Sequence, residues 1–278
     1  MKLKGKIQRM PEKYDNLVSY MAKLGNCAVA FSGGADSSLL LKISHQVLGD
    51  KCTALTYHSP LIPARDIDDS IAFCKEYGIR QIVIERNSIS DEVKKNTSDR
   101  CYLCKKVIFS EIISEAERCG LKNIAEGSNL DDIDDYRPGM KALKELGIIS
   151  PLLECSISKN DVREISAKLG LPTSEKKSSA CLASRIPYGE EIDAVKLKRI
   201  DMSENYISSL GFSDFRVRSH DNLARIEFLQ KDIRSVVESN ILEKISSMLK
   251  SFGFVYVSVD ADGFRSGSMN REIKEKQF

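Results

Sequence analysis

The sequence has no long apolar run and almost no net charge. None of its apolar stretches approaches the roughly 18 consecutive residues that a membrane helix needs, and its first residues lack the apolar core of a signal peptide. Lys and Arg total 42 against 40 Asp and Glu, which leaves a net charge of +2. We therefore expect a cytoplasmic protein that does not bind membranes and that overall charge does not draw toward nucleic acid.

Internal repeats and low-complexity segments are also absent. The 278 residues, of which 42% are hydrophobic, suffice for about two domains with a core each. The eight cysteines do not predict a disulfide framework, because the cytosol keeps thiols reduced. Any cluster among these cysteines therefore indicates metal or redox chemistry.

Short apolar runs alternate with amphipathic stretches in the first half of the chain. Buried strands are predicted at four places: 27–31, 52–57, 81–85 and 123–126. Helices are predicted at 36–48, 65–77, 103–119 and 161–169. This order predicts an α/β fold with a parallel sheet covered by helices on both faces, and ligands at the carboxyl ends of the strands.

A polar stretch at 171–179 is the candidate domain junction, which gives domains at 1–178 and 179–278. The elements predicted beyond it are a helix at 190–210, strands at 215–219 and 223–229, a helix at 231–250 and a strand at 254–259. The short link between the two neighbouring strands predicts a hairpin. The second domain is therefore predicted to be a smaller α+β unit.

Residues 32–38 read Ser-Gly-Gly-Ala-Asp-Ser-Ser between the first strand and its helix. Gly33 and Gly34 let the backbone approach an anion, and the amides at the helix start can donate to phosphate oxygens. Three hydroxyls support these amides: those of Ser32, Ser37 and Ser38. Asp36 is a candidate Mg²⁺ ligand. The alternative is an ordinary glycine turn with N-capping side chains. It is disfavoured, because such a turn needs fewer specified residues than this loop has between a strand and a helix.

Cys101 and Cys104 form a C-x-x-C at a predicted helix start, so both sulfurs can face one side of its first turn. Alone, this spacing is equally compatible with a coincidental pair, a redox pair and a metal site. Cys181 lies in the irregular junction and offers a third sulfur. Three sulfurs leave one corner of a cubane iron–sulfur cluster open, or hold zinc together with a water molecule.

The remaining cysteines are predicted to have no chemical role. Cys27, Cys52 and Cys74 lie in apolar patterns and are expected to pack as small hydrophobic side chains. Cys119 ends a helix, and Cys155 follows a short apolar stretch.

Taken together, these motifs resemble the LarE family, the sulfur transferases of nickel-pincer nucleotide cofactor biosynthesis. The 32–38 loop is similar to the S-G-G-x-D-S PP-loop of the ATP pyrophosphatase superfamily and lacks the lysine of a Walker A loop. The resemblance covers nearly the whole chain through the motifs at 100–105, 127–132, 135–139, 150–154, 180–189, 216–220, 224–227 and 267–270.

The resemblance implies that ATP adenylylates a carboxylate of pyridinium-3,5-biscarboxylic acid mononucleotide with release of pyrophosphate. Sulfur then displaces AMP to give the thiocarboxylate. The resemblance implies that Cys181 is the cysteine that handles sulfur. The presence of Cys101 and Cys104 implies that the chain belongs to the branch of the family that carries a 4Fe-4S cluster on three cysteines. The resemblance also implies a sulfide or persulfide donor and a homo-oligomer, either a trimer or a hexamer.

Further roles combine the resemblance with residue chemistry. Catalysis is expected of Cys181, Arg185 and Asp36. Substrate binding is expected of Arg100, Lys105, Ser184, Arg216 and Arg218. Besides the phosphate loop, nucleotide binding is expected of Tyr57, Ser59 and Gly127.

Some of these assignments have ordinary alternatives. Arg216 and Arg218 also fit a solvated strand face, and Glu204 fits either a metal or substrate contact or a surface position. The acidic run 131–135 fits a solvated loop or a magnesium contact.

Three rival functions fit parts of the same pattern. A tRNA 2-thiolation enzyme also combines this loop with three cysteines, but the charge and the absence of a recognisable RNA module disfavour it. A zinc-stabilised nucleotide-binding protein without turnover would release no AMP. An amidotransferase would leave the cysteines unexplained.

Overall fold

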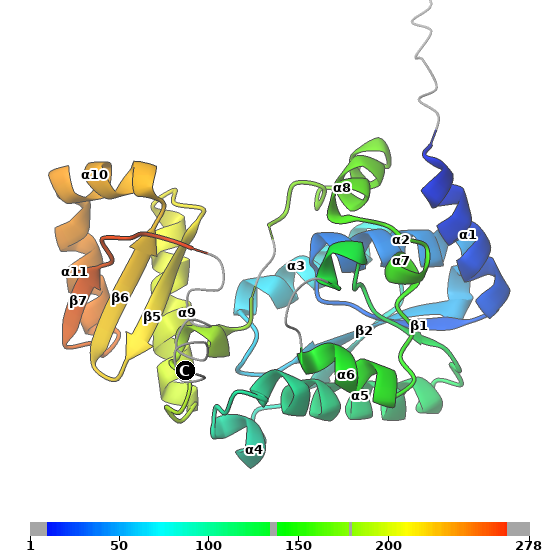
Figure 1. Cartoon of the computed structure of the whole chain (residues 1–278), viewed down its shortest axis with the longest axis horizontal. Coiled ribbons are helices and arrows are strands. Elements are labelled where there is room, and N and C mark those ends of the chain that lie inside the picture. The colour runs from blue at the N-terminus through cyan, green and yellow to red at the C-terminus, as the bar shows by residue number, and fades with distance from the viewer. Residues whose placement is uncertain (1–9, 134–137, 178–179, 266–278) are drawn as a thin grey trace, which may run out of the picture. The chain divides into compact units, whose positions relative to one another are not determined.

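The computed structural model describes residues 10–133, 138–177 and 180–265 (Figure 1). Unit 1 comprises Met1–His58, Ala64–Arg86 and Cys101–Ser179, and unit 2 comprises Ser59–Pro63, Asn87–Arg100 and Ala180–Phe278. The two short segments of unit 2 fall in the first domain of the sequence interpretation. The proposed boundary at 178–179 and the motif at 267–270 lie outside the described residues.

Unit 1 contains a parallel sheet with the strand order β3-β2-β1-β4. Its strands are β1 (Cys27–Ala30), β2 (Cys52–His58), β3 (Gln81–Glu85) and β4 (Ile124–Ala125). All four occur where the sequence predicts them, so the predicted α/β fold with a parallel sheet is confirmed.

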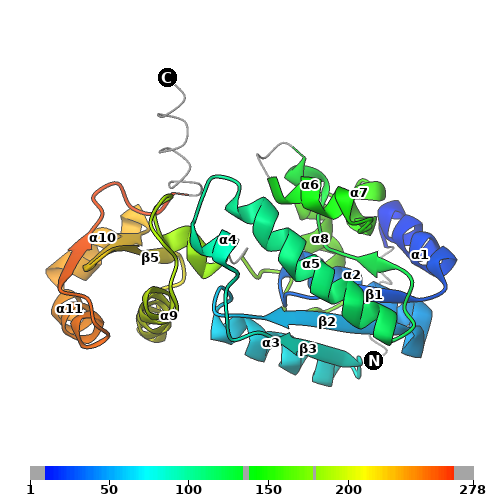
Figure 2. The ribbon, with the colours of Figure 1, turned by 90° about the horizontal axis from the view of Figure 1, so that it is seen from below.

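Helices cover both faces of this sheet (Figures 1 and 2). Side chains alternate along a strand, so Cys27 and Val29 join one apolar cluster and Ala28 joins another. The first cluster includes residues of α1 (Glu12–Leu24), α2 (Ala35–Leu48), α3 (Ala64–Glu76) and α8 (Lys159–Lys168). The second includes residues of α5 (Arg100–Arg118) and α6 (Pro138–Glu145). The sequence predicted neither α1 nor α6.

Unit 2 contains a three-stranded sheet with the order β5-β6-β7. β5 (Phe215–His220) and β6 (Leu223–Phe228) pair antiparallel, which confirms the predicted hairpin, and β7 (Tyr256–Val259) pairs with β6 in parallel. Apolar side chains from these strands pack against α9 (Ala194–Ser209) and two further helices.

The single helix predicted at 231–250 is wrong. The structure has α10 (Gln230–Glu238) and α11 (Ile241–Ser251), because Ser239 adopts an extended conformation that ends the first helix. Both helices bury apolar residues in the same core, which explains why their pattern looked continuous.

Short elements complete the described residues: η1 (Gly49–Lys51), α4 (Asp91–Lys94), η2 (Leu130–Asp132), α7 (Pro151–Glu154) and η3 (Leu182–Arg185). None of the helices in the described ranges combines the length and apolar character needed to cross a bilayer.

Candidate functional site

The phosphate loop, residues 32–38, joins the carboxyl end of β1 to the start of α2. Gly33 has a φ of 71°, and a Cβ at this position would lie 3.1 Å from the carbonyl oxygen of Asp66, so the backbone requires glycine. Gly34 is the N-cap of α2, and no described side chain caps that terminus by a hydrogen bond. The first amides of α2 are therefore available to an anion.

Serine hydroxyls surround this turn. Ser32 Oγ and Ser37 Oγ lie 3.1 Å apart, and the Ser37 hydroxyl also donates to the carbonyl of Gly34. Ser38 is completely buried, and its Oγ has no hydrogen-bond partner among the residues that the structure describes. A buried hydroxyl without a partner is costly, so Ser38 has a donor to spare for a ligand.

Both carboxylate oxygens of Asp36 have partners in unit 1. Asn129 Nδ2 donates to Oδ1 at 3.0 Å, and Lys159 Nζ forms an ion pair with Oδ2. The side chains of Asp36 and Lys159 are 23% and 20% exposed, so this pair is only partly screened by water. An aspartate and a lysine thus stand together at the start of α2.

Lys159 is a residue that the sequence interpretation missed. It lies in the first turn of α8, where the helix dipole disfavours a cation. The Ser158–Asp161 capping box marks this helix start in the sequence. A lysine at such a position indicates a nearby carboxylate, and this signal was available in the sequence.

The described part of the acidic run 131–135 has a structural explanation. Asp131 Oδ2 accepts a hydrogen bond of 2.7 Å from the backbone amide of Lys159, and Asp132 accepts one of 3.0 Å from the amide of Asn129. These carboxylates fix the segments that hold Asp36. Asp134 and Asp135 lie outside the described residues.

The segment after β4 packs directly against the phosphate loop. A Cβ on Gly127 would lie 2.9 Å from the backbone nitrogen of Ser37, so only glycine fits. Glu126 is 6% exposed and accepts hydrogen bonds from the hydroxyls of Ser128 and Ser150. Lys105 Nζ lies 3.9 Å from Glu126 Oε2. This places Lys105 at the carboxyl edge of the sheet, where ligands of such folds bind.

The residues predicted to contact adenine fall in different units. Tyr57 is near the carboxyl end of β2 in unit 1, and burial, followed by the carboxylate of Glu111, raises its pKa. Ser59 belongs to unit 2, where it is buried and its hydroxyl accepts a hydrogen bond from the amide of Leu61.

Cys101 and Cys104 occupy the first turn of α5, and both are partly exposed. Their spacing of three residues places both on one face of the helix. Cys181 is exposed and immediately precedes η3. Cys101 and Cys104 belong to unit 1 and Cys181 to unit 2. Within the described ranges, no three His, Cys, Asp or Glu side chains form a group that could hold a metal ion.

Three other cysteines are core residues, as predicted. Cys27, Cys52 and Cys74 lie in the main apolar cluster of unit 1, and burial raises the pKa of each thiol to about 12. These thiols are therefore held in the protonated, unreactive form.

Arg185 is completely buried, and its guanidinium is surrounded by protein acceptors. Nε and Nη2 donate to the two carboxylate oxygens of Glu204 at 3.0 and 2.9 Å. Nη1 donates to the carbonyls of Ala180 and Cys181 and to Ser184 Oγ. Burial by itself would raise the pKa of Glu204, but Arg185 outweighs it and holds that pKa below its usual value. This geometry favours a positioning role over the direct contact expected from the sequence.

Arg100 is buried as well, and its contacts lie within unit 2. Its guanidinium donates to Asn96 Oδ1 and to the carbonyl of Ala183, and it stacks 4.9 Å from the ring centroid of Tyr188. To bind the substrate as expected, the Arg100 guanidinium would have to give up part of its contacts with Asn96, Ala183 and Tyr188.

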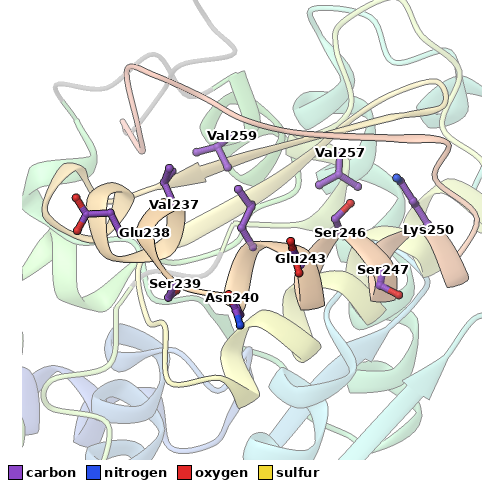
Figure 3. A pocket seen from close by; sticks show the side chains of 11 residues that line it. Val237, Glu238, Ser239, Asn240, Glu243, Ser246, Ser247, Lys250, Val257 and Val259 are labelled. Atoms are coloured by element: carbon purple, nitrogen blue, oxygen red, sulfur yellow. The ribbon is translucent and has the colours of Figure 1, made fainter.

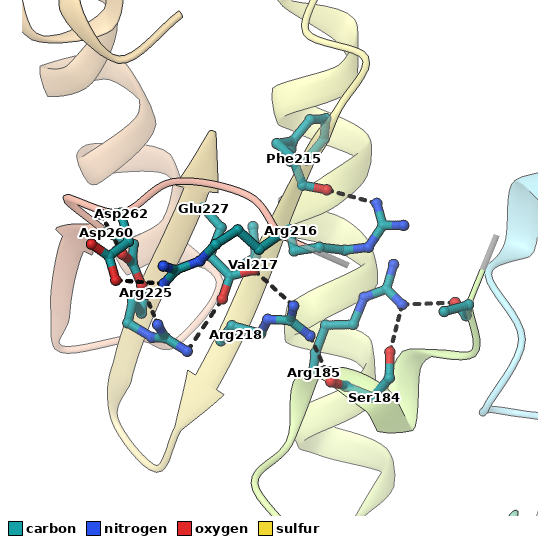
Figure 4. Close-up of polar contacts among 12 residues, drawn as sticks. Ser184, Arg185, Phe215, Arg216, Val217, Arg218, Arg225, Glu227, Asp260 and Asp262 are labelled. Atoms are coloured by element: carbon teal, nitrogen blue, oxygen red, sulfur yellow. Dashed lines mark hydrogen bonds and ion pairs between the residues drawn. The ribbon is translucent and has the colours of Figure 1, made fainter. Parts of the chain in front are cut away.

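Arg216 and Arg218 lie on the face of β5 opposite the apolar core, as their spacing predicts (Figure 4). Arg218 donates to Glu227 Oε2 and to the carbonyl of Ser184, both at 2.7 Å. Glu227 Oε1 also lies 3.3 Å from Arg225, which forms an ion pair with Asp260. Arg218 and Arg225 thus share the carboxylate of Glu227, and Arg216 lies two residues from Arg218 on the same face of β5. Arginine is the side chain best suited to bind carboxylate and phosphate groups through two hydrogen bonds.

A hollow in unit 2 lies apart from these residues. It is lined by α10, α11 and β7, including Asn240, Glu243, Lys250 and Val257 (Figure 3). None of the site residues predicted from the sequence lines it.

The parallel sheet, with a Gly-Gly-x-Asp-Ser turn at its carboxyl edge, defines a nucleotide-binding protein of the PP-loop class. A family model described as NAD synthase matches residues 10–112.

Relatives extend over nearly the whole chain. The pyridinium-3,5-bisthiocarboxylic acid mononucleotide synthase of Lactiplantibacillus plantarum is 36% identical over 268 residues, which cover 96% of each protein. An uncharacterized protein of Synechocystis sp. is 39% identical over 265 residues, 95% of this chain and 99% of that protein. A Methanocaldococcus jannaschii protein is 32% identical over 238 residues, 86% of this chain and 90% of that protein. The chain belongs to the LarE family.

Proposed function

We propose that this protein is an ATP-dependent sulfur transferase that converts a carboxylate of pyridinium-3,5-biscarboxylic acid mononucleotide into a thiocarboxylate. The observation that supports this most directly is the open N-terminus of α2 beside the Asp36–Lys159 pair, in a chain related over its length to a synthase of the bisthiocarboxylic product. The arrangement suits cleavage of a nucleotide between phosphates, and the relative supplies the substrate class.

In the first step, a substrate carboxylate oxygen attacks the α-phosphorus of ATP, and the α–β bond breaks to release pyrophosphate. The amides of α2 and the hydroxyls of Ser32, Ser37 and Ser38 donate to the phosphate oxygens. Tyr57, Ser59 and Gly127 are proposed to border the nucleotide. Lys159 offsets the charge that develops on the departing pyrophosphate.

Asp36 fits a magnesium ligand, because Mg²⁺ is usually bound through one or two carboxylates together with substrate phosphates. Bound Mg²⁺ would neutralise phosphate charge during the cleavage. Asn129, which donates to Asp36 Oδ1, would keep the carboxylate oriented.

In the second step, sulfur attacks the acyl carbon, the bond from that carbon to the phosphate oxygen breaks, and AMP leaves. Arg216 and Arg218 are proposed to bind the anionic groups of the mononucleotide together with Ser184 and Lys105. Arg100 and Arg185 are proposed to act by holding the Cys181 segment, since both guanidinium groups are buried against backbone carbonyls.

Cys101, Cys104 and Cys181 are proposed to hold a 4Fe-4S cluster. Their thiols fit such a group, because all three are at least partly exposed, whereas Cys27, Cys52 and Cys74 are buried. A cluster bound by three cysteines supplies an open iron that can bind sulfide. The proposal includes as donor either sulfide or a persulfide that a thiol reduces to sulfide, with formation of a disulfide, and it includes a trimeric or hexameric assembly.

The test is anaerobic purification and reconstitution, followed by assays for iron, AMP and thiocarboxylate. We expect about four irons per chain in the wild type, and loss of iron with retained ATP binding in Cys101→Ser and Cys104→Ser. Cys119→Ser is the matched control, since Cys119 is also partly exposed.

Iron content that is unchanged in the first two variants would contradict the three-cysteine site. Stoichiometric zinc without AMP formation would favour a nucleotide-binding protein without turnover. Sulfur transfer to tRNA in place of the mononucleotide would overturn the substrate assignment.

A further inference from the structure

The segment that carries Cys181 has no regular secondary structure except the short helix η3, yet buried side chains bind its backbone carbonyls. Arg185 donates to Ala180 and Cys181, Arg100 to Ala183, and Arg218 to Ser184. Asn96 donates to the carbonyls of Ile186, Pro187 and Glu190 at 3.4, 2.7 and 2.9 Å. Such contacts replace the ladder of a helix or strand and fix an otherwise irregular loop.

Asn96 is the residue in this arrangement that no sequence motif includes. It is 0% exposed and has a φ of 53°, a left-handed conformation that few residues other than glycine, asparagine and aspartate adopt readily. Its Oδ1 accepts from Arg100, and its backbone carbonyl accepts from the amide of Gly189 at 3.0 Å. Its Nδ2 and backbone oxygen thus join residues 87–100 directly to residues 186–190, and its Oδ1 holds Arg100, which in turn binds Ala183; both segments belong to unit 2.

The residues joined by Asn96 flank the proposed sulfur site in the sequence. Arg100 directly precedes Cys101, and the Ala183 carbonyl that it binds lies two positions after Cys181. A site that delivers a group to a reacting atom must hold that group in place, because a displacement of about 1 Å strongly lowers the reaction rate.

We infer that Asn96 is a positioning residue for sulfur transfer, holding the segment with Cys181 in the conformation that delivers sulfur to the activated carboxylate. This inference rests on the proposed function, since it assigns to Asn96 the second step and not the cleavage of ATP. Aspartate has the same size but does not meet these needs, because its carboxylate would face three carbonyl oxygens.

The test compares Asn96→Asp and Asn96→Gly with Asn123→Asp. Glycine accepts the left-handed backbone and removes only the side-chain contacts, so it remains informative if the aspartate variant does not fold. Asn123 is a matched control, because its Nδ2 also donates to backbone carbonyls, those of Leu24 and Asn26, but in unit 1. Pyrophosphate and thiocarboxylate are measured together in a single turnover with the enzyme in excess of the mononucleotide, and the ratio of thiocarboxylate to pyrophosphate is the readout.

We expect this ratio to fall at least about tenfold in both Asn96 variants, with pyrophosphate release within about twofold of the wild type, and to stay unchanged in Asn123→Asp. A general loss of stability would lower both products together and leave the ratio constant. In parallel, hydrogen exchange of the amides of Ile186, Gly189 and Ile192 should accelerate in the Asn96 variants, while β5 and β6 remain protected.

A ratio that stays at the wild-type value in folded Asn96 variants would overturn the inference while leaving the proposed function intact. A wild-type protein that forms no thiocarboxylate would overturn the proposed function itself. In that case hydrogen exchange still decides whether Asn96 fixes the segment, and unchanged exchange would refute that as well.

Discussion

In unit 1 the phosphate loop lies between the end of β1 and the start of α2, so regular secondary structure positions its amides and Asp36. In unit 2 the segment with Cys181 has little regular structure, and Asn96, Arg100, Arg185 and Arg218 bind its carbonyls instead. The first kind of site depends on local geometry, whereas the second depends on buried side chains that are distant in the sequence. A motif therefore reports the backbone geometry of the site directly in the first case, whereas in the second it does not separate exposed side chains from buried supporting ones.

The largest effect is expected in the phosphate loop. Asp36→Ala should lower AMP formation about 10²–10³-fold, because it removes the carboxylate that is proposed to bind Mg²⁺ and that pairs with Lys159. AMP is measured by chromatography under saturating ATP. Asp50→Ala, a change of an exposed aspartate in η1, is the control and should leave the rate unchanged. A rate for Asp36→Ala close to that of the wild type would exclude a catalytic role for this carboxylate.

A large loss of stability is expected when the buried pair of unit 2 is broken. Arg185→Ala leaves Glu204 buried without its cation, which should lower the free energy of unfolding by about 3–5 kcal/mol. Urea titration followed by hydrogen exchange of β5 and β6 reports this unit. Arg234→Ala removes an exposed i,i+4 pair with Glu238 and should cost about 0.5 kcal/mol or less. Equal losses in the two variants would show that Arg185 does not support unit 2.

A smaller effect separates two glycines that share a left-handed backbone. Gly33 and Gly147 have φ values of 71° and 69°, but an added Cβ would have neighbours within 4 Å only at Gly33, and the nearest is the carbonyl oxygen of Asp66. Gly147→Ala should cost about 1 kcal/mol from backbone strain alone. Gly33→Ala should cost more and also weaken ATP binding, as measured by thermal unfolding and calorimetry. Wild-type affinity for ATP in Gly33→Ala would mean that the loop conformation is not required.

The smallest effect concerns the helix that carries Lys159. Burial opposes the ionised form of Asp161, but Lys13 and the Ser158 cap outweigh it, so its pKa in the folded protein lies below the usual value of 3.8. The ionised carboxylate therefore adds stability above the unfolded pKa, and this contribution is lost as the pH falls through the folded pKa.

Asp161→Asn should cost about 0.5–1 kcal/mol at pH 7, and the difference from the wild type should shrink at pH 3. Thermal unfolding at both pH values measures it, with Glu164→Gln in the same helix as control. A difference that is equal at both pH values would contradict this assignment.

Much of the fold was predictable because it follows from local periodicity. The four strands of unit 1, the hairpin of unit 2 and the phosphate loop occur where apolar runs and glycines place them. The break at Ser239 was not predictable in the same way, because α10 and α11 face one core and present a continuous apolar pattern.

By itself, the sequence determined the nucleotide-binding loop, the core position of three cysteines and the family, because each depends on residue type and spacing within short segments. Only the tertiary structure decided that Lys159 pairs with Asp36, that Arg100 and Arg185 are buried, and that Asn96 joins two distant segments. The physical reason is that hydrogen-bond partners such as these lie 91 and 123 positions apart, and no local pattern records which donor will meet which acceptor.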